Sequence, residues 1–217
     1  MIEPFCGGLS MTCAMIKEIP LVQVIASDAA PGLITLYEAV RSGWVPPQEL
    51  SREQWAALKT RAGEDDRLVA FAGFGCSFNG VYFASYGEPS FARQAAAGLE
   101  RKIGVCSKVR FLARPYQEIS VDDPCVIYCD PPYRNTDPSA YRSLKFTDHA
   151  RFDSDAFWVW CREQAHRGAH VLVSEYAGPV WARTVWERPL SCLTGAHAGN
   201  VSTAVERLFY VGPSEVA

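Results

Sequence analysis

A short apolar run that ends in two prolines constrains the fold of this chain more than any other feature. Residues 124–129 are apolar enough to form a buried strand, and Asp130-Pro131-Pro132-Tyr133 follows them directly. The prolines end the strand because they lack the backbone amide that a sheet would use. The motif therefore puts a carboxylate and an aromatic ring at the carboxyl end of a strand, the edge where open α/β sheets bind ligands. An acceptor pair beside a flat ring suits a planar amino group on a heterocycle, although a purely structural turn with a packed tyrosine has the same residues.

Strands and helices that alternate around this run predict an α/β protein with a mostly parallel sheet. Pro31 suits the first position of a helix, and Ser51 with Gln54 has the pattern of a capping box. The last two strands indicate an antiparallel addition to the sheet, and residues 64–115, where glycines separate aromatic-rich pieces, indicate an insertion. The predicted strands cover residues 1–5, 21–27, 109–113, 125–129, 170–174, 188–193 and 204–211, and the predicted helices cover residues 9–18, 31–41, 51–61, 90–102, 153–167 and 179–187.

The composition is that of an ordinary globular chain. With 217 residues, 48% of them hydrophobic and 21% charged, the chain can bury a full α/β core in one domain. It has no apolar run approaching about 18 residues and no signal-peptide pattern, so we expect a cytoplasmic protein. Eight cysteines without a Cys-x-x-Cys pair, and four scattered histidines, predict buried reduced thiols rather than disulfides or a metal site. Four tryptophans in predicted helices are expected to be packing groups rather than platforms for bases: Trp158, Trp160, Trp181 and Trp186.

A second candidate site lies where the first predicted strand runs into the glycine pair Gly7-Gly8 and then a helix. Glycines at such a turn let a ligand approach the backbone, and the start of a helix offers free amides. Asp28 follows about 20 residues on, at the end of the next strand, where a carboxylate can accept both hydroxyls of a ribose. Asp28 can equally cap the helix that begins at Pro31.

In this order, the glycine turn, the acidic residue and Asp-Pro-Pro-Tyr resemble the Dam-type DNA adenine N6-methyltransferases. Residues 3–8, Glu-Pro-Phe-Cys-Gly-Gly, look like the S-adenosylmethionine turn of that family. Residues 27–37 look like its acidic segment followed by a Leu-Ile-x-Leu-Tyr helix. Residues 76–82 are similar to its Cys-Phe-Asn-Gly-Leu-Tyr stretch with Ser77 as an extra residue, and residues 111–118 match its aromatic-acid segment. The resemblance extends from residue 2 to about residue 212.

The resemblance implies one methyltransferase domain over residues 1–217, with a Rossmann-like fold, a mostly parallel central sheet, an antiparallel late strand and a small helical target-recognition insertion at 44–107. It implies S-adenosylmethionine as the cofactor and no metal. Asp130 and the Pro131 carbonyl would draw the target amino group toward a nucleophilic form for direct in-line transfer, and Tyr133 would stack on the base. The implied catalytic residues are Asp130, Pro131, Pro132 and Tyr133. The implied cofactor-binding residues are Glu3, Pro4, Phe5, Cys6, Gly7, Gly8, Asp28, Tyr116, Glu118 and Asp130.

The implied partner is double-stranded DNA, from which the target adenine is flipped because its amino group is out of reach within a duplex. A net charge of −3 gives no overall attraction to DNA, so we expect a local cluster of cations. The chain is densest in cations between Arg93 and Arg114, where a solvated helix face is the alternative interpretation. The predicted DNA contacts are Arg93, Arg101, Lys102, Lys108, Arg110, Arg134, Arg142 and Lys145.

The sequence departs from the family at its start. Dam-type enzymes carry a segment with Gly-Gly-Lys before the glycine turn, whereas this sequence starts at Met1, two residues before Glu3. There are three explanations: a start site set too late, a minimal enzyme whose pocket is completed by a partner or second subunit, and a relic that binds DNA without methylating it. A monomer is the default expectation. Cytosine N4 and adenine in RNA also have an exocyclic amine whose lone pair is delocalised into the ring, and they are alternative substrates. The recognition sequence and the biological role, whether restriction-modification, phage self-protection or regulation, stay open.

Overall fold

The computed structural model describes residues 1–19, 23–78, 81–121, 124–133, 152–192 and 202–213. These residues form an α/β protein, as predicted. The chain divides into two compact units, one made by Met1–Ile119 and the other by the described parts of Ser120–Thr136 and Phe152–Ala217. Each unit has its own strands and helices and is described in turn.

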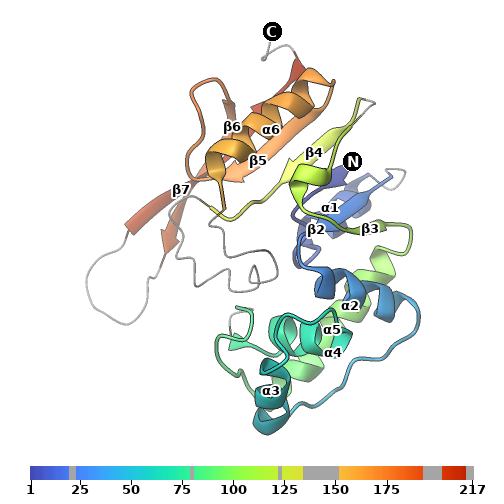
Figure 1. Cartoon of the computed structure of the whole chain (residues 1–217). Helices are drawn as coiled ribbons and strands as arrows, with labels where there is room; N and C mark the ends of the chain where they lie inside the picture. The colour runs from blue at the N-terminus through green and yellow to red at the C-terminus, as the bar shows by residue number, and fades with distance from the viewer. Residues whose placement is uncertain (20–22, 79–80, 122–123, 134–151, 193–201, 214–217) are drawn as a thin grey trace. The chain divides into compact units, whose positions relative to one another are not determined.

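Three parallel strands form the sheet of the first unit (Figure 1, blue to green). They are β1 (Ile2–Glu3), β2 (Ile25–Asp28) and β3 (Arg110–Ala113), and β2 lies between the other two. Although β1 is short, Ile2 is in register with Ile25. The amide of Ile25 also donates to the Met1 carbonyl at 3.0 Å. All three strands were predicted, with ends that differ by a few residues.

The helices of the first unit begin where the sequence supplies a start. Pro31 is the first residue of α2, and Ser51 caps α3 through a complete capping box, in which the Gln54 amide donates to Ser51 Oγ and the Ser51 amide donates to Gln54 Oε1. The helices are α1 (Ser10–Glu18), α2 (Pro31–Arg41), α3 (Arg52–Lys59), α4 (Arg67–Ala70) and α5 (Pro89–Val105), with a π-helical turn η1 (Phe71–Gly75) and a 3₁₀ turn η3 (Tyr116–Glu118).

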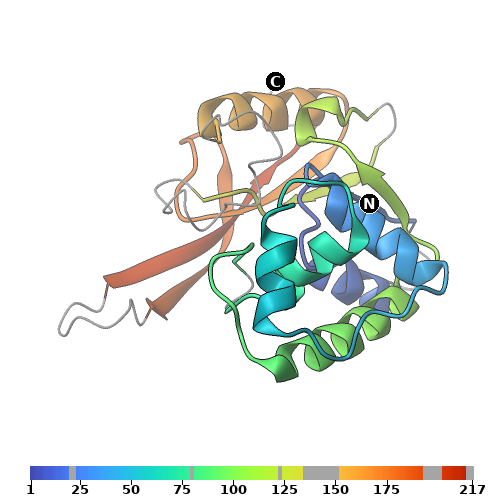
Figure 2. The same cartoon turned by 60° about the horizontal axis from the view of Figure 1, so that its bottom comes forward.

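Residues 44–107, predicted to form a helical insertion, do contain helices, which lie beside α2 in Figure 2. The buried side chains of these helices and of α2 belong to one apolar core. Trp55 of α3 is buried and packs 5.3 Å from the Phe83 ring, between ring centroids. Its indole nitrogen donates to Ser77 Oγ at 3.2 Å. Ser77, the extra residue in the stretch that resembles the methyltransferases, is therefore a buried partner of a core tryptophan. A target-recognition role for this region stays a prediction.

The second unit contains a four-stranded sheet and one long helix (Figure 1, yellow to red). Its strands follow the order β4-β5-β7-β6, with β4 parallel to β5 and with β7 antiparallel to both of its neighbours. The antiparallel late strands are therefore confirmed. The elements are β4 (Val126–Cys129), α6 (Ser154–His166), β5 (His170–Glu175), β6 (Arg183–Cys192) and β7 (Ser202–Val211).

The helix predicted at residues 179–187 is wrong, because β6 already begins at Arg183. Thr184, Val185 and Trp186 are β-branched or aromatic, which favours a strand, and Thr184 and Trp186 pair with Phe209 and Leu208 of β7. The register shifts between Thr184 and Trp186, so Val185 lies in an irregular part of the ladder. Trp186 is 48% exposed and is not the packing group that we predicted.

Other tryptophans do pack as predicted. Trp158 and Trp160 of α6 are buried, and the Trp158 ring stands edge-on to Trp181 and to Phe209 of β7, with centroids 5.9 and 5.7 Å apart. These contacts attach α6 to the sheet of the second unit. No helix among the described residues is long and apolar enough to cross a membrane.

The described cysteines are free thiols, as predicted, and all but Cys125 are buried. The sulfur atoms of Cys13 and Cys106 lie 3.5 Å apart. Burial is the main cause of the raised pKa of Cys106, which is about 12, so this thiol stays protonated at neutral pH. The thiols are Cys6, Cys13, Cys76, Cys106, Cys125, Cys129 and Cys161.

Candidate functional site

The predicted cofactor turn joins β1 to α1 and has an unusual backbone. Gly7 has a φ of +38°, in the left-handed region that favours glycine, and Leu9 follows with a φ of 60°. The Cys6 amide donates to the Ser27 carbonyl at 2.9 Å, which continues the pairing of the first two strands past the end of β1. Gly7 therefore begins a turn that leaves the edge of the sheet and enters α1.

Asp28, at the end of β2, connects this turn to the start of α2. Its Oδ2 accepts the Gly7 amide at 3.0 Å, and its Oδ1 accepts the Ala30 amide at 2.9 Å. Asp28 therefore contacts the glycine turn and the N-cap residue of α2, Ala30, although that N-cap has no side-chain cap hydrogen bond of its own. The ribose interpretation of Asp28 stays a prediction. Each carboxylate oxygen has a second lone pair, so two acceptor positions are left for a ligand. Burial raises the pKa of Asp28, while the amides of Ala30 and Gly7 lower it less strongly.

Two further side chains hold the turn through its carbonyl groups. Tyr37 of α2 is buried and donates its hydroxyl to the Gly7 carbonyl. Lys102 of α5 donates its ammonium to the Gly8 carbonyl and lies 3.5 Å from Ser10 Oγ. We predicted Lys102 as a DNA contact, and the structure places its ammonium at the glycine turn. Tyr37 was missed as a site residue, although it is the tyrosine of the Leu-Ile-x-Leu-Tyr helix.

The aromatic residues predicted near the cofactor lie together. The Phe5 and Tyr116 rings are 5.5 Å apart between centroids and tilted by 33°, and Tyr116 is buried. Glu118, at the end of the same 3₁₀ turn, is exposed. The first unit thus brings Phe5 close to Tyr116 and Gly7 close to Asp28, across 111 and 21 positions of sequence.

The remaining residues of the turn have structural contacts. Glu3 is buried and accepts the Thr12 hydroxyl of α1. Pro4 and Cys6 are also buried. Burial, together with the nearby charges of Asp28 and Glu3, raises the pKa of the Cys6 thiol well above its usual value. Cys6 is accordingly a neutral packing group.

The Asp-Pro-Pro-Tyr motif ends β4 in the second unit, as predicted. Asp130 is exposed and Pro131 is buried. Although Asp130 is exposed as a whole, desolvation by surrounding protein is the main cause of the raised pKa of its carboxyl. The charge of Glu206 raises this pKa further, and the hydroxyl of Tyr133 lowers it.

Tyr133 is held by residues that the sequence did not identify. Its hydroxyl lies 2.6 Å from Ser174 Oγ of β5 and donates to Glu206 Oε1 of β7 at 3.1 Å. Its ring stands edge-on to Tyr176, with centroids 4.7 Å apart and an interplanar angle of 89°. Burial is the main cause of the raised pKa of Tyr133, which keeps the phenol protonated. No local pattern identifies Ser174 and Glu206, which follow Tyr133 by 41 and 73 residues.

The predicted DNA contacts fall into three groups. Arg101, Lys108 and Arg110 are exposed, and Arg110 projects from β3. Arg93 is also exposed and lies 3.8 Å from a Glu49 carboxylate oxygen. Lys102 is at the glycine turn, and the last group lies outside the described residues: Arg134, Arg142 and Lys145.

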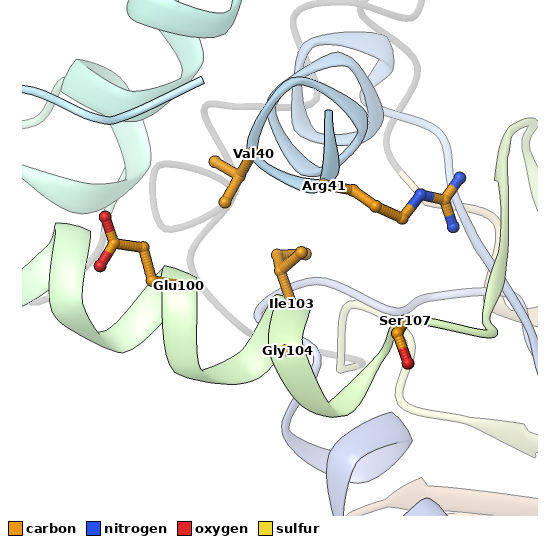
Figure 3. A pocket seen from close by; sticks show the side chains of 6 residues that line it. All are labelled: Val40, Arg41, Glu100, Ile103, Gly104 and Ser107. Atoms are coloured by element: carbon orange, nitrogen blue, oxygen red, sulfur yellow. The ribbon is translucent and has the colours of Figure 1, made fainter. Parts of the chain in front are cut away.

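A surface hollow of about 320 Å³ lies between α2 and α5 of the first unit (Figure 3). Val40 and Ile103 approach it from the two helices, while the Arg41 side chain extends away from Val40. Arg41 donates to the Val109 carbonyl at 2.7 Å and pairs with Glu38, so its charge is already satisfied. None of the predicted site residues lines this hollow, which is a gap in helix packing rather than a candidate cofactor site. Its lining residues are Val40, Arg41, Glu100, Ile103, Gly104 and Ser107.

The sequence was compared with models of known protein families and with curated proteins. No model of a known protein family matches the sequence. No curated protein is similar enough to count as a match. Within the described part of the chain, no group of three or more His, Cys, Asp or Glu side chains is placed to hold a metal ion. The functional interpretation therefore rests on the contacts of the glycine turn and of the Asp-Pro-Pro-Tyr motif.

Proposed function

We propose that this protein is a Rossmann-like, S-adenosylmethionine-dependent methyltransferase that methylates the N6 amino group of adenine in DNA. The observation that carries the proposal is the 3.0 Å hydrogen bond from the Gly7 amide to Asp28. It joins a left-handed glycine turn to an acidic residue at the end of the next strand. Two separate pieces of the sequence resemblance thereby meet in one place, as the parts of a nucleoside-binding site have to do.

The residues of the first unit fit the cofactor. A Cβ at Gly7 would meet nothing within 4 Å, so the backbone there is open to an approaching group. The free acceptor positions of Asp28 suit the two hydroxyls of a ribose. Phe5, half-buried beside Tyr116, offers an apolar ring surface. When bound, the cofactor supplies a methyl group on a positively charged sulfur.

The second unit would hold the group that accepts the methyl. The lone pair of an exocyclic amine is delocalised into the base, so the amine is a poor nucleophile in its planar form. Asp130, when ionised, is an acceptor only, and with the Pro131 carbonyl it would draw both amine protons to one side. Because Asp130 is exposed, an amine from outside the protein can reach its carboxylate. Tyr133 would offer its ring to the flipped base.

Contacts to DNA phosphates are proposed for the exposed cations Arg93, Arg101, Lys108 and Arg110. Lys102 is left out of this set because its ammonium contacts the Gly8 carbonyl. Cations of this kind fix the protein on the duplex without reading its sequence.

The test is a methyl-transfer assay with the full chain, methyl-labelled S-adenosylmethionine and duplex DNA, in which the modified nucleoside is identified. We expect N6-methyladenine. Asp130→Ala should abolish transfer, while Glu163→Ala, which removes an exposed carboxylate from α6, should leave transfer unchanged. Binding of S-adenosylmethionine, measured by calorimetry, should weaken in Asp28→Ala and persist in Asp130→Ala.

Each contrary result has its own meaning. Label on cytosine N4 or on adenine in RNA would refute the choice of DNA adenine and retain amine methylation. Salt-dependent DNA binding without binding of S-adenosylmethionine would refute the methyltransferase proposal and support a noncatalytic DNA-binding protein.

A further inference from the structure

Tyr133 is held by side chains from two other strands of the second unit. Its hydroxyl lies 2.6 Å from Ser174 Oγ and 3.1 Å from Glu206 Oε1, and Ser174 donates to the same Glu206 oxygen at 3.0 Å. The three oxygen atoms therefore form a closed triangle. Tyr133 and Ser174 each have one proton to donate, and an ionised glutamate accepts both.

A second contact restrains the Tyr133 ring itself. The Tyr176 ring stands edge-on to the Tyr133 ring at 4.7 Å between centroids. A tyrosine side chain has only two torsions that move its ring, so a held hydroxyl and a neighbouring ring together restrict its orientation.

We propose that Ser174 and Glu206 are positioning residues, which hold the Tyr133 ring in the orientation that receives the target base. This inference rests on the function proposed above. It assigns a role to two polar residues on β5 and β7 that the sequence resemblance leaves without one.

The Tyr133 hydroxyl indicates that the network does more than pack the ring. Stacking on a base uses the face of a ring, which phenylalanine supplies equally well, whereas partly buried polar groups cost free energy unless they are paired. The titratable groups that act on Asp130 among the described residues are Tyr133 and Glu206. The Tyr133 hydroxyl lowers the pKa of Asp130 and the charge of Glu206 raises it, so the orientation of Tyr133 also affects the carboxylate that would accept the amine protons.

The experiment measures kcat, KM for DNA and the pH profile of methyl transfer for Tyr133→Phe, Glu206→Gln and the double variant. We expect each single variant to lower kcat about tenfold with KM changed less than about twofold, because a misplaced reacting group mainly slows the chemical step. The double variant should be no more than about twofold slower than the slower single variant, since both changes break the same contact. In Glu206→Gln the acid limb of the profile should move to lower pH, because removing a neighbouring negative charge lowers the pKa of Asp130.

Two matched variants control for the loss of a hydroxyl or a charge. Tyr210→Phe removes a hydroxyl on β7 that contacts His170, and Glu163→Gln neutralises an exposed carboxylate on α6. Both should keep the wild-type kcat. If the wild type transfers methyl and Tyr133→Phe and Glu206→Gln match it, or if their effects on kcat multiply in the double variant, the positioning role is wrong. If the wild type transfers no methyl at all, the proposed function fails and this inference falls with it.

Discussion

Replacing Asp28 tests whether the acidic residue holds the glycine turn as well as a ligand. Both of its oxygens accept backbone amides, from Gly7 at 3.0 Å and from Ala30 at 2.9 Å. Asp28→Ala removes both acceptors, whereas Asp28→Asn keeps one oxygen and presents an amino group to the other amide. The two variants therefore differ by one satisfied backbone amide.

The size of the effect follows from the contacts. Leaving a buried amide without an acceptor costs about 1–3 kcal/mol, so two amides cost roughly 2–6 kcal/mol in Asp28→Ala. Removing a carboxylate whose burial raises its pKa recovers part of this cost. We expect the free energy of unfolding of Asp28→Ala to fall by about 2–4 kcal/mol and that of Asp28→Asn to fall by half as much or less. Urea titration of tryptophan fluorescence measures both.

The pH dependence provides a second check with a defined sign. The pKa of Asp28 is raised above 3.8, so the folded state binds the proton more tightly than the unfolded state does. The wild type should therefore lose stability relative to Asp28→Asn as the pH rises from about 3.8 through the folded-state pKa. For Asp66 the stability changes with pH in the opposite direction, because its pKa is lowered. Burial alone would raise its pKa, but the Val69 and Leu68 amides and Arg61 lower it, so the wild type should lose stability relative to Asp66→Asn as the pH falls.

If Asp28→Ala lowers the free energy of unfolding by less than about 1 kcal/mol, Asp28 does not hold the two amides, because one unsatisfied amide alone costs more. An Asp28→Asn variant that is as unstable as Asp28→Ala would lead to the same conclusion. Equal pH slopes for the Asp28→Asn and Asp66→Asn pairs would contradict the opposite directions of the two pKa shifts.

Three further changes probe the turn and the cations. Gly7→Ala places a side chain at a φ of +38° and should lower the free energy of unfolding by about 1–2 kcal/mol. Gly8→Ala should lower it less, because the added Cβ would meet Lys102 only at 3.6 Å. Equal losses in urea titration would show that the backbone at Gly7 is not strained by a side chain. Tyr37→Phe loses the hydrogen bond to the Gly7 carbonyl and should cost about 1 kcal/mol in thermal unfolding, so an unchanged Tm would show that the bond contributes nothing. Arg110→Gln should reduce the slope of log affinity for DNA against log salt by about 0.9 on every duplex, while Arg67→Gln, whose guanidinium lies over the Trp44 ring, should not; equal slopes would remove Arg110 from the DNA contacts.

The parts of the fold that the sequence predicts well are those set by neighbouring residues. Pro31 starts α2 and the Ser51–Gln54 capping box starts α3, because both signals act within one helical turn. The apolar run before Asp130 forms β4 and ends at the prolines for the same local reason. The predicted start of β6 was wrong because the residues of this strand pair with β7, which lies later in the chain.

Site residues that belong to a sequence motif were predicted, and those that reach the site only through strand register were missed. Gly7, Asp28 and Tyr133 have recognisable neighbours in the sequence. Ser174 and Glu206 meet Tyr133 only because β5 and β7 are paired in a particular register, in which Ser174 is opposite Leu208. A shift of β7 by one residue would turn Glu206 to the other face of the sheet, and no local pattern fixes that register.

The contact between Lys102 and the Gly8 carbonyl links two parts of the first unit that the sequence separates by 94 residues. α5 belongs to the region predicted to recognise DNA, and Gly8 belongs to the turn predicted to hold the cofactor. A ligand that moves α5 relative to Gly8 changes the free energy of the glycine turn. By linkage, a ligand at the turn then changes the affinity for the first ligand by the same factor. Occupancy of one ligand would then alter affinity for the other without any residue that touches both.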